Sequence, residues 1–174
     1  MTKVINLFGG PGTGKSSTAA ELFSLMKWKG YNVELVSEYA KKVTWEGHTN
    51  LLHDQLYLLA KQNRSLERLR GQVDYIITDS PLLLGAHYTK AGYLNGTFLD
   101  AVFALYDTYD NVNIMLKRHK PYLKVGRSQT EEEAKNIDVK LEILLHNNDI
   151  PYYNVDALQG CSADILNIIT SIES

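Results

Sequence analysis

Short apolar segments alternate along this chain with longer segments in which apolar residues recur every three or four positions. The short segments predict five strands, at residues 4–8, 33–36, 73–79, 111–117 and 150–155. The longer segments predict helices at residues 16–29, 51–69, 97–109, about 130–146 and 163–172. Residues 38–42 begin a further helix or loop, and residues 119–130 have no periodicity and predict a loop.

Strands that alternate with helices predict crossover connections and a parallel sheet with helices packed against it. The 174 residues contain no repeat and no linker, so we expect one domain spanning residues 1–174. In an α/β protein of this kind the ligand binds at the carboxyl ends of the strands. Residues that follow a predicted strand are therefore the first candidates for a site.

Composition narrows the class of protein without identifying it. The net charge of -2 gives no general attraction to nucleic acid or to an anionic membrane surface. The single cysteine, Cys161, leaves no partner for an intramolecular disulfide. No apolar run approaches the length of a membrane span. We expect a cytoplasmic protein without a membrane partner.

The segment after the first predicted strand reads GGPGTGKS and satisfies the P-loop pattern G-x-x-x-x-G-K-[ST]. Its glycines let the backbone turn its N–H groups toward phosphate oxygens, and the helix that follows directs its positive end at the same anion. The lysine of such a loop reaches the β- and γ-phosphates of a nucleotide. The predicted ATP-binding residues are Gly9, Gly10, Pro11, Gly12, Thr13, Gly14, Lys15, Ser16 and Ser17.

A metal site is predicted beside this loop. The Ser16 hydroxyl can join the coordination shell of Mg²⁺, and Asp79 is the last residue of the third predicted strand. An acid at that position would face the P-loop and hold the ion through water. A turn-forming Asp before Ser80 and Pro81 is the structural alternative.

A basic segment, KRHKPYLKVGR, follows the fourth predicted strand. We expect a lid over approximately residues 118–130, with Arg118 and Arg127 neutralising charge on a transferred phosphoryl group. The alternative is a solvated basic loop.

Several classes of P-loop protein are compatible with these motifs. The chain contains neither the N-K-x-D nor the D-x-x-G string expected of a GTPase. A small kinase fits the length and the basic segment, and a mechanical ATPase would normally need more chain. A nucleotide-sensing or DNA-associated ATPase, with water as its only acceptor, stays open.

Four stretches, FGGPGTGKSS, VELVSEYAK, DYIITDSPLLL and LKRHKPYLKVGRSQTEEEA, resemble the nucleotide-kinase branch of P-loop proteins. That branch includes thymidylate and deoxynucleoside kinases, and within it the chain resembles small phage-encoded members. The resemblance implies ATP and Mg²⁺ as ligands and a three-layer fold with sheet order 2-3-1-4-5. Some phage relatives phosphorylate the hydroxymethyl group of 5-hydroxymethyl-deoxyuridine in DNA, which would place this protein in the host cytoplasm. Relatives are often dimers, so a homodimer is one expectation.

The chain departs from thymidylate kinases where those enzymes place an Asp-Arg pair. The corresponding strings, Ser37-Glu38-Tyr39 and Asp79-Ser80-Pro81, contain no arginine. Deoxynucleoside kinases instead have a Glu after the second strand, and Glu38 matches that position. A hydroxyl acceptor benefits from a carboxylate that takes its proton, whereas an anionic phosphate acceptor does not. The favoured acceptor is thus a hydroxyl, such as that of 5-hydroxymethyluracil in DNA, with a free deoxynucleoside monophosphate as the alternative.

The second helix of this scheme, 51–69, should flank the acceptor. Tyr39, Gln55, Gln62 and Arg68 are the predicted acceptor-binding residues. Trp45 and Tyr57 are further candidates for stacking on a base, with simple packing as the alternative. By resemblance, Asp156 and Ala157 pass along the adenine of ATP.

Overall fold

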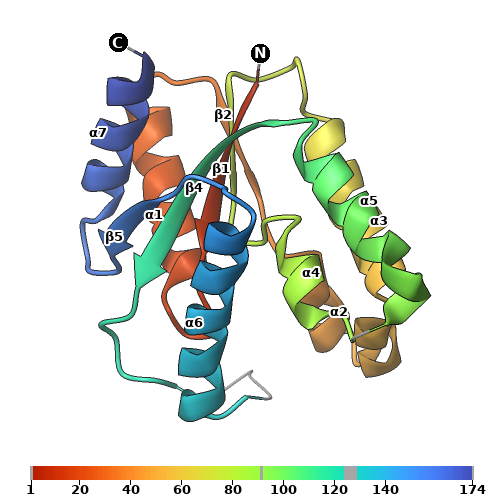
Figure 1. Ribbon diagram of the computed structural model, residues 1–174. Coiled ribbons are helices and arrows are strands. Elements are labelled where there is room, and N and C mark those ends of the chain that lie inside the picture. The colour runs from red at the N-terminus through yellow and green to blue at the C-terminus, as the bar shows by residue number, and fades with distance from the viewer. Residues whose placement is uncertain (1, 91, 124–128, 174) are drawn as a thin grey trace.

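The computed structural model describes residues 2–90, 92–123 and 129–173, and it is an α/β sandwich of three layers (Figure 1). The strands are β1 (Lys3–Phe8), β2 (Val33–Val36), β3 (Tyr75–Thr78), β4 (Asp110–Lys117) and β5 (Tyr153–Asp156). They form one parallel sheet in the order β2-β3-β1-β4-β5. This order confirms the one that the resemblance implied.

Helices cover both faces of the sheet (Figure 1). The α-helices are α1 (Lys15–Trp28), α2 (Tyr39–Trp45), α3 (Gln55–Glu67), α4 (Leu84–Tyr88), α5 (Thr97–Tyr106), α6 (Glu131–Asn147) and α7 (Ser162–Glu173). Two 3₁₀ turns, η1 (Thr49–His53) and η2 (Tyr93–Gly96), precede α3 and α5.

Alternation along β1 divides the core in two. Ile5 and Leu7 pack with α1 and α7 on one face, and Val4 and Phe8 pack with α3, α5 and α6 on the other. All four side chains are at most 1% exposed. Because neighbouring residues of a strand point to opposite faces, the continuous apolar segment 4–8 suits a strand that is buried on both sides.

The prediction of one continuous helix over 51–69 is wrong at its start. The chain forms η1 and then α3, because Asp54 caps α3 by accepting a hydrogen bond from the Tyr57 N–H at 3.0 Å. The predicted helix at 97–109 ends at Tyr106, and the strand predicted at 150–155 begins at Tyr153, after Pro151. The short helix α4 and the turn η2 were not predicted.

The helix predicted to start at Thr130 is confirmed by its cap. Thr130 Oγ1 accepts from the Glu133 N–H at 3.2 Å, and the Glu133 carboxylate accepts from the Thr130 N–H at 2.7 Å. This reciprocal pair is the capping box that the sequence indicated. It fixes the start of α6, which matters below because α6 packs on the P-loop.

No helix within the described ranges is both long and apolar enough to span a membrane.

Candidate active site

The P-loop connects β1 to α1 at the carboxyl edge of the sheet. Gly12 has φ 77° and Gly14 has φ 115°, left-handed conformations that favour glycine. Gly14 is the N-cap residue of α1, and it lacks a side chain that could cap the first turn. The first N–H groups of α1 are therefore left for an anion, as a phosphate-binding loop requires.

Lys15 folds back over this loop. Its Nζ donates to the carbonyl oxygens of Gly9 at 2.6 Å and Gly10 at 3.1 Å. Burial lowers the pKa of Lys15, while the nearby carboxylates of Glu38 and Asp79 act in the opposite direction. The ammonium group is thus held at the centre of the site by carbonyl groups and opposite charges.

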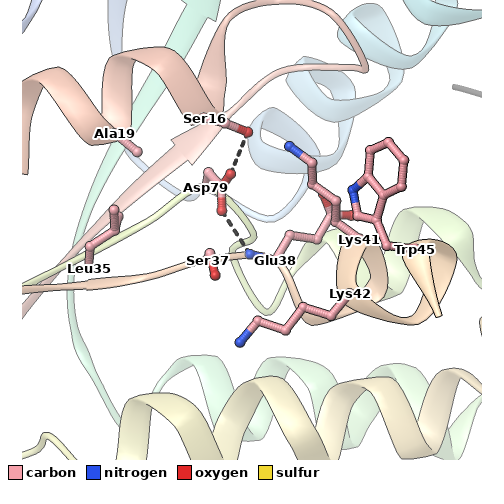
Figure 2. A pocket seen from close by; sticks show the side chains of 9 residues that line it. All are labelled: Ser16, Ala19, Leu35, Ser37, Glu38, Lys41, Lys42, Trp45 and Asp79. Carbon is pink, nitrogen blue, oxygen red and sulfur yellow. Dashed lines mark hydrogen bonds between the residues drawn. The ribbon is translucent and has the colours of Figure 1, made fainter. Parts of the chain in front are cut away.

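Asp79 joins the ends of three strands. Its Oδ2 accepts from Ser16 Oγ at 2.6 Å, and its Oδ1 accepts from the Glu38 N–H at 2.9 Å (Figure 2). The side chain is buried, and the contact with Ser16 arises because β1 and β3 are neighbours in the sheet. The structure thereby brings the predicted metal-binding pair together.

Glu38 lies directly beside this pair, between β2 and α2. Burial raises the pKa of its carboxyl group, Lys15 opposes the rise, and the negative charge of Asp79 adds to it. A carboxyl group whose pKa lies closer to neutrality is a better proton acceptor for catalysis than an ordinary one.

Arg118 lies across the P-loop instead of extending into solvent. Its Nε donates to Asp138 Oδ2 at 2.9 Å, and Nη2 donates to Thr13 Oγ1 at 3.3 Å. Its side chain is only 9% exposed, and Nη1 is buried without a hydrogen-bond partner among the described residues. A buried guanidinium N–H without an acceptor fits a phosphate oxygen that the protein itself does not supply.

Asp138 of α6 is a site residue that the sequence did not indicate. Its Oδ1 accepts from the Gly10 N–H at 2.5 Å while Oδ2 holds Arg118, so one carboxylate ties α6 to both the P-loop and the arginine. The approach is close because position 10 lacks a side chain. A Cβ atom at Gly10 would lie 2.5 Å from the carbonyl oxygen of Ala134 and 2.8 Å from Asp138 Oδ1.

Tyr88, at the end of α4, is a second residue that the sequence did not indicate. Its side chain is 42% exposed, and partial burial, with smaller contributions from the negative charges of Glu38 and Asp138, raises its pKa to about 12. A neutral phenol therefore lies within electrostatic reach of both carboxylates.

Of the four predicted acceptor residues, Tyr39 and Gln62 are in direct contact, whereas Gln55 and Arg68 are not joined to them by a hydrogen bond within the described residues. The Gln62 side chain is buried, accepts from the Tyr39 N–H at 3.2 Å and donates to Thr78 Oγ1 at 3.3 Å, so it ties α2 to β3. The Tyr39 hydroxyl lies 2.9 Å from that of Tyr57. Gln55 donates to the Leu52 carbonyl oxygen at 2.8 Å, within η1.

Arg68 is placed away from the site. It is the C-cap residue of α3, and the chain continues from there to Gln72, which accepts a hydrogen bond from Asn32 just before β2. That is the amino edge of the sheet, whereas the P-loop is at the carboxyl edge. The prediction that Arg68 contacts the acceptor does not agree with this placement.

Residues after β5 lie close to the P-loop. A Cβ atom at Gly14 would be 3.7 Å from Cβ of Ala157 and 3.6 Å from Nζ of Lys120. Asp156 Oδ1 lies 2.7 Å from His119 Nε2, which links β5 to the segment after β4. Of the predicted lid, Arg127 lies outside the described residues.

A pocket of ≈ 260 Å³ opens beside Ser16, Glu38 and Asp79. Figure 2 shows it between the start of α1, the end of β2 and α2. Lys41, Lys42 and Trp45 of α2 also line it.

The comparisons with known proteins agree with this geometry. The sequence profile described as an AAA domain matches residues 4–159. The chain belongs to this AAA-domain family. No curated protein sequence matches it.

Solved structures of two kinases have the same fold. Deoxyadenosine kinase from M. mycoides with bound dATP is 21% identical with a TM-score of 0.59, over 98% of this chain and 100% of that one. Thymidylate kinase from Ehrlichia chaffeensis is 14% identical with a TM-score of 0.63, over 97% of this chain and 100% of that one. The whole chain thus has the P-loop kinase fold.

Proposed function

We propose that this protein is an ATP-dependent kinase that transfers a phosphoryl group to a hydroxyl of a nucleotide-type acceptor. One observation carries the proposal. The two oxygens of Asp79 accept hydrogen bonds from Ser16 of the P-loop and from the backbone N–H of Glu38. The Glu38 carboxyl group, whose pKa is raised, therefore lies beside the loop. The likeness in fold to a deoxynucleoside kinase and a thymidylate kinase supports it.

The site fits Mg²⁺ and the phosphates of ATP. The loop has glycines in left-handed conformations, and the donor groups of Lys15 and Arg118 lie along it. Ser16 and Asp79 provide hard oxygen donors, which Mg²⁺ prefers, and the ion would neutralise charge on the phosphates.

In the proposed step the acceptor oxygen attacks the γ-phosphorus, and the bond to the oxygen shared with the β-phosphate breaks. The hydroxyl proton passes to the Glu38 carboxylate. Lys15 and Arg118 hold the phosphates and stabilise charge as it spreads over the transferred group. We propose Arg127, which lies outside the described residues, as a further cation for this charge.

The acceptor that we favour is a hydroxyl such as the 5-hydroxymethyl group of 5-hydroxymethyluracil in DNA. Glu38 supports a hydroxyl, because a group that must lose a proton gains from a neighbouring base. We also propose that the protein forms a homodimer and acts in the host cytoplasm. Both proposals come from the resemblance to phage-encoded and other nucleotide kinases.

The test is a transfer assay with γ-labelled ATP and Mg²⁺. The acceptors are the four deoxynucleoside monophosphates, free deoxynucleosides, ordinary DNA and DNA containing 5-hydroxymethyluracil, and product masses locate the label. Label on a hydroxyl is the expected result. Label on the phosphate of a monophosphate would make the protein a monophosphate kinase. Free phosphate without any labelled acceptor would overturn the kinase proposal in favour of an ATPase.

A further inference from the structure

The wall of the pocket beside Glu38 combines two cations with an aromatic side chain. Lys41, Lys42 and Trp45 all come from α2, and all three line the same pocket as Ser16 and Asp79 (Figure 2). The proposed chemistry at the P-loop uses none of the three. These three side chains therefore line the pocket without a role in that chemistry.

The two lysines bring positive charge to the pocket without a direct ion pair in the described part of the chain. No ion pair within that part involves either Lys41 or Lys42, whereas Lys3, Lys27, Lys117 and Lys135 are each paired with a carboxylate. Both lysine residues are exposed. Lys41 is close enough to Glu38 to lower the pKa of that carboxyl group against the effect of burial. A positive charge thus lies beside Glu38, the proposed general base.

Trp45 is 73% exposed although it lines a pocket. A large aromatic ring in water forgoes the free energy that burial would provide. Stacking on a nucleobase would cover this ring, and aromatic side chains flanked by cations are a common way to hold single-stranded nucleic acid.

We propose that Lys41, Lys42 and Trp45 form a subsite for a phosphate-bearing nucleotide, with the phosphate on the lysines and a base against Trp45. This subsite rests on the proposed function, because it presents the acceptor hydroxyl to Glu38. Its substrate class is a nucleotide that keeps its own phosphate as an anchor, rather than an uncharged nucleoside.

Two sources share this chemistry, a free mononucleotide and a nucleotide within a strand. The side chains of Lys41 and Lys42 leave α2 in different directions (Figure 2). Two diverging cations suit successive phosphates of a strand better than one terminal phosphate. We therefore expect a strand to bind more tightly than a mononucleotide.

The chain offers a direct readout, because Trp28 and Trp45 are its only tryptophans. The variant Trp28→Phe leaves Trp45 as the single tryptophan, and position 28 is 89% exposed at the end of α1, so the fold should be unaffected. This protein is titrated with thymidine, thymidine 5′-monophosphate and short thymidine oligonucleotides. Saturating ADP and Mg²⁺ keep the P-loop filled, and calorimetry checks that ADP binds.

We expect the oligonucleotides to quench Trp45 fluorescence and thymidine to leave it unchanged. Changing both lysines, Lys41→Ala with Lys42→Ala, should weaken binding at least about tenfold. The slope of log affinity against log salt should fall by about 0.7 for each phosphate contact that is lost. Trp45→Ala, followed by calorimetry, should weaken binding about tenfold. The matched control is Lys29→Ala, an exposed lysine beside Trp28, and it should change nothing.

Quenching by the monophosphate as strong as that by the oligonucleotides would identify the free nucleotide as the source. An absence of quenching, or quenching that persists unchanged without the two lysines, would overturn the subsite. Binding is measured without phosphoryl transfer, so failure of the subsite and failure of the proposed function give different results. A protein that binds the strand and transfers no phosphate would keep the subsite and lose the kinase. A kinase that shows no quenching would lose only the subsite.

Discussion

The two sides of the candidate site differ in how far their polar groups are already paired. On the P-loop side, Lys15, Arg118 and Asp138 are joined to the loop by hydrogen bonds. On the α2 side, Lys41 and Lys42 project from an exposed helix without an ion pair in the described ranges.

This difference indicates what each side has to recognise. The P-loop side is organised in advance, as a site for one invariant triphosphate and its reaction would be. The α2 side gains its partners only when a ligand arrives, which suits an acceptor that is larger or more variable. Each prediction below tests one part of that contrast.

Lys15→Ala should have the largest effect. It removes the cation that the loop carbonyls hold, and we expect transfer to slow by about 10³-fold, since a preorganised donor to developing charge is worth this order of magnitude. Steady-state transfer rates measure it, with Lys29→Ala as the control. A rate within about twofold of the unchanged protein would show that the P-loop side is not the phosphoryl-transfer machinery.

Glu38→Gln should slow transfer by about 10²-fold, the lower part of the range for a general base. The raised pKa also sets the direction of the pH dependence. Because burial favours the protonated form, the fraction of active carboxylate in the free enzyme rises with pH through a value above that of an ordinary Glu.

The kcat/KM profile should therefore have an acidic limb above about pH 4.3, and the limb should vanish in Glu38→Gln. A profile that keeps the same limb in the variant would assign the proton to another group. ADP affinity serves as the control, because Glu38 acts on the acceptor.

Arg118→Ala and Asp138→Ala should each slow transfer about tenfold, and together they should cost little more than either alone. The reason is that Asp138 acts by positioning Arg118, so the second change removes an interaction that the first has already broken. A double-mutant cycle on kcat measures the coupling. Effects that multiply would mean that the two residues act independently.

Asp138→Asn separates the two contacts of this carboxylate. The amide oxygen can still accept from the Gly10 N–H, but the charge that holds Arg118 is gone. A kcat close to that of Asp138→Ala would assign the effect to Arg118 and not to the loop backbone.

The sequence predicted the parts of this molecule that depend on neighbouring residues. The P-loop, the five strands and the capping box at Thr130 are local patterns, and each formed where it was expected, except that β5 begins at Tyr153 and not at residue 150. Asp54 shows where such reading fails. Asp54 is the N-cap residue of α3, so the helix begins at residue 55 and not at 51. The leucines on both sides of Asp54 continue the helical spacing, so the spacing alone predicts one uninterrupted helix over 51–69.

The rest could not be predicted because it depends on how distant elements pack. Asp138 is one acid among several on an amphipathic helix, and only the docking of α6 on Gly10 gives it a role. Tyr88 belongs to a helix of five residues, which is too short for periodicity to reveal. Arg68 is the opposite case, because it was predicted to contact the acceptor but lies at the C-terminal end of α3, away from the P-loop.

The bond from Gly10 to Asp138 has a consequence for the motion of the site. The capped start of α6 lies directly after the predicted lid, so any movement of that segment that lifts α6 must break the Gly10 bond. The Gly10 amide proton then exchanges with solvent only as often as α6 leaves the loop. Hydrogen exchange at the Gly10 amide thereby reports how often α6 separates from the P-loop, and the measurement needs no substrate.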